Sequence, residues 1–265
     1  MTSPESAIPD IPIEIASFEI RNRGPWTTVE YHHWPDYTVG HTTRLSAGAS
    51  INFENGKVME KLSTLGFPRG HHHAEQVHGS RSARVEGPSA CHRGVDGLVS
   101  QGATKKSSPS LFVRTADCLP VYLLSCDDSD YALVHAGWRG LVNTIFPAVL
   151  DRFFDGPVEL FVGPHIPQNT YEVGPEVLSA VEDCLHMTRS ELVEADIVDS
   201  QRHLDLFQVF LILVSRWDGK VKKIWRSPMS TPQSNPVPLP SYRENQGRER
   251  MVHWFFSDHA RGNYL

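Results

Sequence analysis

The chain has 265 residues, a net charge of −6 and no dense run of lysine or arginine, which argues against nucleic-acid binding and against attachment to anionic membranes. No apolar run approaches the length of about 20 residues that a membrane-spanning helix needs. The first 15 residues lack the features of a secretory signal, and four widely spaced cysteines without a Cys-x-x-Cys pair do not form a disulfide framework. We therefore expect reduced thiols and a cytoplasmic location.

The N-terminal part of the chain predicts short strands. Residues 1–12 are rich in proline and are predicted to be flexible, so a single domain is expected over residues 13–265. Between residues 13 and 43, short apolar runs alternate with turn residues, which is typical of short strands. Apolar residues at helical spacing over residues 57–65 predict a short helix that stops at Gly66.

Two apolar runs in the middle of the chain predict neighbouring strands. Residues 121–124 and 131–134 are strand-like, and the polar turn signal of residues 127–130 lies between them. The two runs are therefore interpreted as a hairpin or as adjacent strands. Cys118 precedes the first run and His135 follows the second. This arrangement brings a thiol and an imidazole close together in space.

The second half of the chain alternates helices and strands. The expected elements are helices over residues 141–153, 175–185 and 207–217, strands over residues 158–162 and 251–256, and a proline-rich loop over residues 227–241. Pro147 either kinks the first of these helices or places its start later in the chain. No repeat and no long linker divides the chain, so we predict one α+β domain.

Three residues far apart in the sequence form a candidate metal site. His78, Cys118 and His135 offer one sulfur and two nitrogens, and a set of three ligands is typical of catalytic zinc because it leaves a fourth position open. Spacing alone does not establish such a site. The alternative is that Cys118 is a small buried hydrophobic residue and His135 a hydrogen-bonded core histidine.

Other motifs give weaker signals. Residues 97–102 have the glycine spacing of a phosphate-binding loop, but Ala103-Thr104 follows where Lys-Ser or Lys-Thr is required, so this interpretation is rejected. The run His71-His72-His73 offers metal ligands, although an exposed histidine-rich loop is the favoured interpretation. Glu172 is a candidate general acid or base, and the simpler explanation is that it caps the helix that follows.

Several blocks of the sequence resemble the signature blocks of the YfiH-like proteins, which are also called laccase-domain proteins or multicopper polyphenol oxidoreductases. The strongest blocks are Gln76-Val77-His78-Gly79, Thr115-Ala116-Asp117-Cys118-Leu119-Pro120-Val121 and His135-Ala136-Gly137-Trp138-Arg139-Gly140. Weaker blocks follow in the same order as in the family, and they are Thr42-Thr43-Arg44, Val95-Asp96-Gly97-Leu98-Val99, Gly163-Pro164-His165-Ile166, Tyr171-Glu172-Val173-Gly174, Ser241-Tyr242-Arg243 and Gly247-Arg248. The resemblance covers roughly residues 35–256.

The resemblance implies a fold, a metal and an activity. The fold is a four-layer sandwich of mixed β-sheet flanked by helices, and one zinc ion per chain is held by His78, Cys118 and His135. The activity is phosphorolysis of adenosine, inosine, guanosine or methylthioadenosine, together with deamination of adenosine. The partners are then a purine nucleoside and inorganic phosphate, and the chain is expected to be a monomer or a weak homodimer. A multicopper oxidase needs four coppers and repeated His-x-His pairs, which this chain does not offer.

The family-like blocks also supply candidate site residues. The catalytic candidates are Arg44, Gln76, Asp117, Glu172 and Arg243, and the phosphate-binding candidates are Arg139 and Arg248. Phosphate binding calls for guanidinium groups. Successive side chains of an extended strand alternate between faces, so Asp117 next to Cys118 is expected to be a supporting carboxylate; a bulge would reverse that argument.

Departures from the family pattern concern the substrate more than the metal. Ser230-Thr231 stands where Cys-Thr is usual, Asn169-Thr170 where cysteine is common, and Glu244 where a second arginine is usual. Three hypotheses follow: a zinc-dependent purine nucleoside phosphorylase or deaminase, which is favoured, a hydrolase that edits peptidoglycan precursors, and a zinc-stabilised binding module without catalysis. A family member that acts on a specialised metabolite is a variant of the first.

Overall fold

The computed structural model describes most of the chain. The described residues are 11–23, 26–43, 67, 70–102, 108–217, 219–232, 236–245 and 249–258. The helix predicted over residues 57–65 lies outside them, and so do the candidates Arg44 and Arg248. A flexible N-terminus over residues 1–12 stays a prediction. No described helix is long and apolar enough to cross a membrane.

The strands of the described residues form two mixed sheets of seven strands each. In spatial order, the first sheet contains β1 (Ile13–Ile15), β13 (Val221–Arg226), β12 (Val158–Val162), β10 (Leu119–Ser125), β11 (Tyr131–Ala136), β8 (Gly97–Ser100) and β6 (Ser82–Arg84). The second contains β2 (Phe18–Arg23), β3 (Trp26–Tyr31), β4 (Tyr37–Thr42), β14 (Met251–Ser257), β9 (Ser110–Thr115), β5 (His71–Glu75) and β7 (Ala90–Arg93). Each sheet combines antiparallel pairs, such as β10 with β11, with parallel ones, such as β5 with β9.

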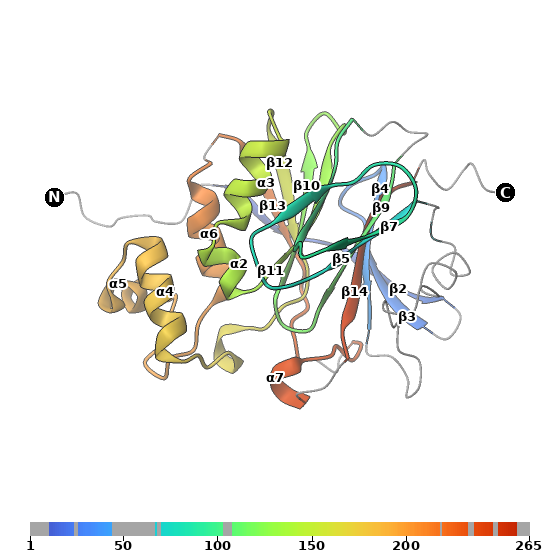
Figure 1. Ribbon diagram of the computed structural model, residues 1–265. Helices are drawn as coiled ribbons and strands as arrows, with labels where there is room; N and C mark the ends of the chain where they lie inside the picture. The colour runs from blue at the N-terminus through green and yellow to red at the C-terminus, as the bar shows by residue number, and fades with distance from the viewer. Residues whose placement is uncertain are drawn as a thin grey trace.

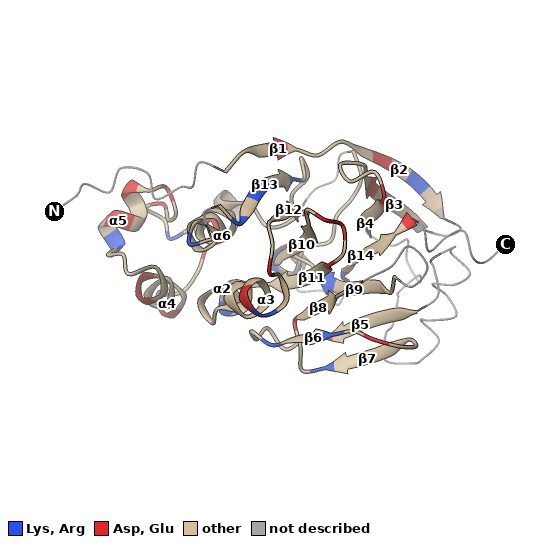
Figure 2. Cartoon of the chain, turned by 90° about the horizontal axis from the view of Figure 1, so that it is seen from above, with Lys and Arg blue, Asp and Glu red and all other residues tan. Residues whose placement is uncertain are grey.

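Helices cover one face of the first sheet, and the second sheet covers the other (Figures 1 and 2). The helical elements are α2 (Trp138–Val142), α3 (Ile145–Phe153), η2 (Gln168–Thr170), α4 (Pro175–Leu185), α5 (Arg189–Glu194), α6 (Leu206–Ser215) and α7 (Tyr242–Asn245). The described residues thus build three layers, and the fourth layer that the resemblance implied is not found among them. The α+β fold, a single domain of layered mixed sheet flanked by helices, is confirmed.

The central strands of the first sheet, such as β10 and β11, are buried on both faces, and their side chains alternate between two cores. On β10, Leu123 packs into the core beneath the helices, whereas Tyr122 and Leu124 pack into the core between the sheets. This alternation follows from the two-residue period of a strand. The predicted hairpin is confirmed, since β10 pairs antiparallel with β11 and Val121 lies opposite Val134.

Local signals explain where the helices begin. Helix α6 starts after Asp205, whose carboxylate accepts from two backbone N–H groups of the first turn, and α4 starts after Gly174 with Pro175 at its first position. The helix expected over residues 141–153 is two helices. Thr144 has a φ of 66°, and this left-handed residue interrupts the helix between α2 and α3. Pro147 is then the third residue of α3, where its missing N–H costs no hydrogen bond.

Several elements were not predicted, and one interpretation is wrong. Among these elements are helix α5, which carries a capping box between Thr188 and Glu191 that is present in the sequence, and strand β13. The histidine run is not an exposed loop: it forms β5, where His71 is 2% exposed and His72 is fully buried. The run lies between β7 and β9, and a strand with neighbours on both sides is shielded from water.

Candidate metal centre

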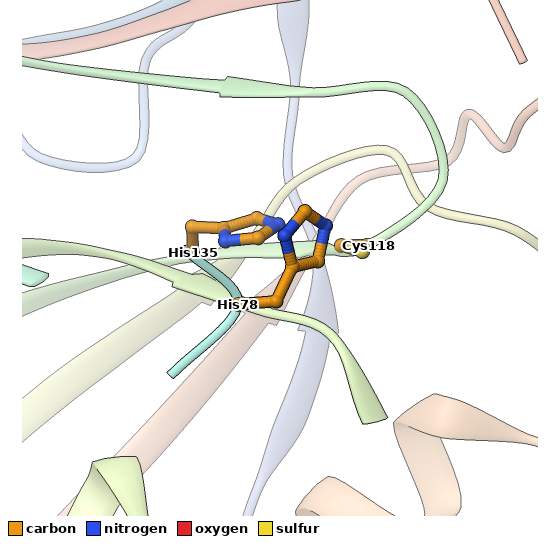
Figure 3. Close-up of side chains that lie close together, drawn as sticks. All are labelled: His78, Cys118 and His135. Carbon is orange, nitrogen blue, oxygen red and sulfur yellow. The ribbon is translucent and has the colours of Figure 1, made fainter. Parts of the chain in front are cut away.

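The three predicted metal ligands lie together (Figure 3). His78 follows β5, Cys118 lies in the bend between β9 and β10, and His135 lies on β11. One donor atom from each lies within 4.8 Å of the other two, and this is the only such group of three or more among the described residues. The two imidazole rings meet edge to face, with their centroids 4.7 Å apart. The prediction that these three side chains converge is confirmed.

Strand register explains the convergence. On one side of β11, Leu119 pairs with Ala136, which places Cys118 beside Gly137. On its other side, β8 pairs with β11, so the residue before β8 lies next to His135. That residue is Asp96, whose backbone carbonyl accepts from the His135 N–H at 2.7 Å. His135 therefore has a thiol on one flank and a carboxylate on the other.

Gly137 makes room for this arrangement. A Cβ atom at Gly137 would lie 2.9 Å from the Cys118 sulfur and 3.5 Å from Cδ2 of His78. The first distance is too short for a real carbon–sulfur contact, so a larger residue would push the cysteine away from the histidines. The glycine of the His-Ala-Gly-Trp-Arg-Gly block is thus required by close approach to the ligands.

Asp96 was not among the predicted site residues, yet it holds the buried histidine ligand. The Asp96 Oδ1 atom lies 2.8 Å from Nδ1 of His135, and the two side chains are 0% and 2% exposed. With Nδ1 held by the carboxylate, the Nε2 lone pair is left for a metal. The sequence held a signal in the Val95-Asp96-Gly97 block, but no spacing rule connects it to His135.

Mutual interactions set the ionisation of the ligands. Burial acts to raise the pKa of the Cys118 thiol, but the neighbouring His135 and His78 imidazoles outweigh it and lower that pKa to about 6. Burial acts to lower the pKa of His135, but the Cys118 thiolate and the Asp96 carboxylate raise it to about 9. Cys118 is therefore a thiolate at neutral pH, which is the form that binds metals.

The donor set fits a metal ion. One thiolate and two imidazoles suit a metal of intermediate softness, and three protein ligands leave further positions for substrate or water. His135 is buried, Cys118 is half-buried and His78 is exposed, so the site opens to solvent on the His78 side. The alternative of two ordinary core residues does not account for the third donor, His78, which lies within 4.8 Å of the other two.

Asp117 lies in a bend, so the extended-strand argument for its orientation is wrong. Residues 116–118 form this bend between β9 and β10. The Asp117 carboxylate accepts from Oγ1 of Thr231 at 2.7 Å and from the backbone N–H of Arg243 at 2.8 Å. Its backbone carbonyl accepts from the N–H of Ile166 at 2.9 Å. Asp117 thus ties three loops to the cysteine bend.

Two of the predicted arginines lie on aromatic rings near the cysteine loop. The guanidinium carbon of Arg243 lies 5.2 Å from the ring centroid of Tyr171, and that of Arg139 lies 4.4 Å from the ring of Trp138. Burial raises the pKa of the Tyr171 phenol, and the Cys118 charge raises it further, while Arg243 lowers it. Tyr171 was not among the predicted site residues, although its block was recognised.

Gln76 and Glu172 are both engaged by protein groups. The Gln76 side chain donates to the carbonyl of Arg114 and accepts from its N–H, at 2.7 and 2.8 Å, so it fixes the ligand loop to β9. Glu172 accepts from the guanidinium of Arg202 at 2.8 Å and is 57% exposed. It does not cap α4, whose cap residue is Gly174. The catalytic roles of both residues stay predictions.

A family model described as multi-copper polyphenol oxidoreductase laccase matches residues 49–255. The chain belongs to this YfiH-like family. A purine nucleoside phosphorylase from Xylella fastidiosa strain Temecula1 is 31% identical over 145 residues, which are 54% of this chain and 55% of that relative. Adenosine deaminase RL5 from an unknown prokaryotic organism is 31% identical over 131 residues, 48% of each chain. This YfiH-like chain thus spans about half the length of the curated relatives it matches.

Solved structures agree in fold with this family assignment. The YfiH protein of Bacillus licheniformis superimposes with a TM-score of 0.71 at 20% identity, covering 89% of this chain and 98% of that one. Protein NMB0706 of Neisseria meningitidis superimposes with a TM-score of 0.68 at 21% identity, covering 89% of this chain and 100% of that one. At these identities the similarity establishes the fold alone.

Proposed function

We propose that this YfiH-like protein is a zinc-dependent purine nucleoside phosphorylase, which converts a purine nucleoside and inorganic phosphate into the free base and a pentose 1-phosphate. The observation that carries the proposal is a three-ligand metal site whose cysteine loop is tied, through Asp117, to the segment that bears Arg243. The metal ligand Cys118 and the proposed phosphate-binding Arg243 are thereby held on connected loops. The name of the X. fastidiosa relative supports the same reaction.

Zinc is the proposed metal, with one ion per chain. His78, Cys118 and His135 would hold it, because zinc accepts mixed sulfur and nitrogen ligands and keeps an open position when three protein ligands bind it. When bound, zinc supplies a Lewis acid and a positive charge at the open side of the site. Only one ligand group of this kind occurs in the described part of the chain, which fits poorly with an oxidase that needs several coppers.

The arginines supply the phosphate site in this proposal. Arg139 and Arg243 are exposed, and no described carboxylate forms a salt bridge with either one. Bidentate contacts from a guanidinium suit a phosphate dianion. Arg44 and Arg248 remain candidates for the same role. Gln76 fixes the ligand loop, and Glu172 remains a candidate for proton transfer.

In this mechanism a phosphate oxygen attacks C1′ of the ribose while the bond from C1′ to the purine nitrogen breaks. The electron pair of that bond leaves with the base, which then takes up a proton, so the products are base and pentose 1-phosphate. The transition state resembles an oxocarbenium ion. Arginines hold the nucleophile, and Tyr171 remains a neutral hydrogen-bond donor because its pKa is raised.

Deamination of adenosine is a second candidate activity of the same metal site. The relative named adenosine deaminase RL5 favours it, and so does a metal site with an open position.

All four cysteines are free thiols, which supports the proposed cytoplasmic location. Small molecules, a nucleoside and phosphate, are the proposed partners of a chain that acts as a monomer or weak homodimer.

The test uses purified protein of known zinc content with a panel of purine nucleosides, in the presence and absence of phosphate. Chromatography detects free base and deaminated products, and Cys118→Ala is the control. We expect base release that requires phosphate and is lost in the control. Stoichiometric zinc without turnover of any nucleoside would contradict the proposal. Amino-acid release from a muropeptide precursor would select the hydrolase, and zinc that raises the melting temperature without any turnover would select a binding module.

A further inference from the structure

We propose that Asp96 is the positioning residue that assembles the metal centre, because its one carboxylate holds both histidine ligands. The first contact is with the side chain of His135, at 2.8 Å. The second is with the backbone of the turn that carries His78. This inference rests on metal binding, which is part of the proposed function, and does not depend on the substrate.

The turn that carries His78 wraps around the Asp96 carboxylate. Three successive backbone N–H groups point at it: that of Val77 reaches Oδ2 at 3.3 Å, that of His78 reaches Oδ1 at 2.9 Å, and that of Gly79 reaches Oδ2 at 2.8 Å. Consecutive N–H groups arranged in this way form an anion-binding nest. A carboxylate of the protein itself therefore fills this nest.

The nest holds His78 in an uncommon backbone conformation. His78 has a φ of 59°, in the left-handed region that is unfavourable for a residue with a side chain. The charged hydrogen bonds to Asp96 offset that cost. Without them the turn is free to relax to a negative φ, which would point the His78 imidazole away from Cys118 and His135.

The same carboxylate fixes the orientation and tautomer of His135. Asp96 is fully buried, and all four of its side-chain contacts are with donors: the three backbone N–H groups of the nest and Nδ1 of His135. A proton on Nδ1 leaves Nε2 as the metal-binding nitrogen. Asparagine cannot replace this carboxylate, because its NH₂ group would face either His135 or the nest.

The chain offers a matched control in Asp199. Its carboxylate contacts Nδ1 of His203 at 2.7 Å and the backbone N–H groups of Gln201 and His203 at 2.9 and 2.8 Å. This is the same combination of an imidazole and backbone donors, but neither Asp199 nor His203 belongs to the metal-binding group. Asp199→Asn therefore removes comparable hydrogen bonds without touching the metal centre.

The experiment measures the zinc affinity of the full-length protein by competition with a chromophoric chelator, for the wild type, Asp96→Asn and Asp199→Asn. Loss of a carboxylate that supports a metal-binding histidine typically weakens affinity about 10–100-fold, so we expect that change in Asp96→Asn. The Asp199→Asn variant should stay within about 2-fold of the wild type, since it leaves the ligand shell intact. Circular dichroism of the metal-free proteins establishes that each variant is folded. A folded Asp96→Asn variant with wild-type affinity would overturn the proposal.

A second measurement needs no variant and decides the matter if Asp96→Asn does not fold. Long-range ¹H–¹⁵N NMR spectra of the zinc-loaded wild type should show His135 with its proton on Nδ1 and the metal on Nε2. A deprotonated Nδ1 would overturn the proposal. Asp96-dependent zinc binding without nucleoside turnover would sink the proposed function alone, whereas normal turnover with unchanged zinc affinity in Asp96→Asn would sink this inference alone.

Discussion

Two aspartate–histidine pairs in the described part of the chain share a similar hydrogen-bond pattern, an imidazole together with backbone N–H groups, and differ in their surroundings. At the metal centre, Asp96 and His135 are 0% and 2% exposed, and at the α5–α6 connection, Asp199 and His203 are 36% and 19% exposed. The buried pair has the Cys118 thiolate beside it, and the exposed pair does not. The comparison teaches that the carboxylate orients the imidazole in both places, whereas burial and the thiolate turn only one pair into part of a metal site.

The largest expected effect is on zinc affinity, and it follows from removing the Cys118 thiolate, which lies beside only one of the two pairs. Cys118→Ser replaces the thiolate by a hydroxyl that stays protonated at neutral pH, so we expect at least a 100-fold loss of zinc affinity, on the order of 3 kcal/mol. Metal content after dialysis and chelator competition measure it. Cys184→Ser on α4 is the control and should retain one zinc. Full zinc occupancy in Cys118→Ser would mean that the histidine pair alone makes the site.

Crowding the thiolate should have the next largest effect. Gly137→Ala places a Cβ 2.9 Å from the Cys118 sulfur, so the cysteine must move away from His135. We expect zinc affinity to fall about 10-fold and overpacking to lower the free energy of unfolding by about 1–3 kcal/mol. Urea unfolding with and without zinc measures both. Gly156→Ala is the control, because no atom lies within 4 Å of the position that its methyl group would occupy, and it should change neither quantity.

Asp117 is a third carboxylate that can be compared with Asp96 and Asp199. It links loops to one another and does not orient an imidazole. Asp117→Asn weakens the links to Thr231 and to the backbone of Arg243, so we expect the KM for phosphate to rise about 10-fold while zinc affinity is unchanged. Steady-state kinetics at varied phosphate and chelator competition separate the two effects. A parallel loss of zinc would place Asp117 with Asp96 as a support of the ligands.

The last prediction concerns histidines that are buried without a carboxylate. Nδ1 of His41 and of His165 lies next to a backbone carbonyl, and burial lowers both pKa values to about 4, in contrast to about 9 for His135. Unfolded histidine titrates near 6.5, so below that pH the unfolded chain binds more protons and stability falls until the pH reaches about 4. At pH 5 each buried histidine should cost about 2 kcal/mol of unfolding free energy.

Urea unfolding at pH 7.5 and pH 5 measures this acid sensitivity. His41→Gln should make the free energy of unfolding less dependent on pH over this interval. An equal pH dependence in wild type and His41→Gln would show that this histidine does not stay neutral in the folded protein.

The sequence by itself determined the local elements and the chemistry of the ligands. The β10–β11 hairpin, helices α4 and α6 and strand β14 follow from periodicity and from turn and cap signals, which depend on neighbours along the chain. The three metal ligands were predicted from a thiol and an imidazole placed beside two neighbouring strands, together with the resemblance to the YfiH-like blocks, because spacing alone does not establish such a site. The break at Thr144 was missed, since Pro147 was the visible helix breaker and the left-handed residue was not.

Only the tertiary structure decided how distant strands meet. The pairing of β8 with β11 brings Asp96 to His135, the pairing of β5 with β7 and β9 buries the histidine run, and the bend at residues 116–118 turns Asp117 toward Thr231 and Arg243. Nothing local encodes these contacts, because the same strand sequence can pair in several registers until the two cores select one. The residues that hold the metal ligands in place are therefore the ones that sequence patterns did not reveal.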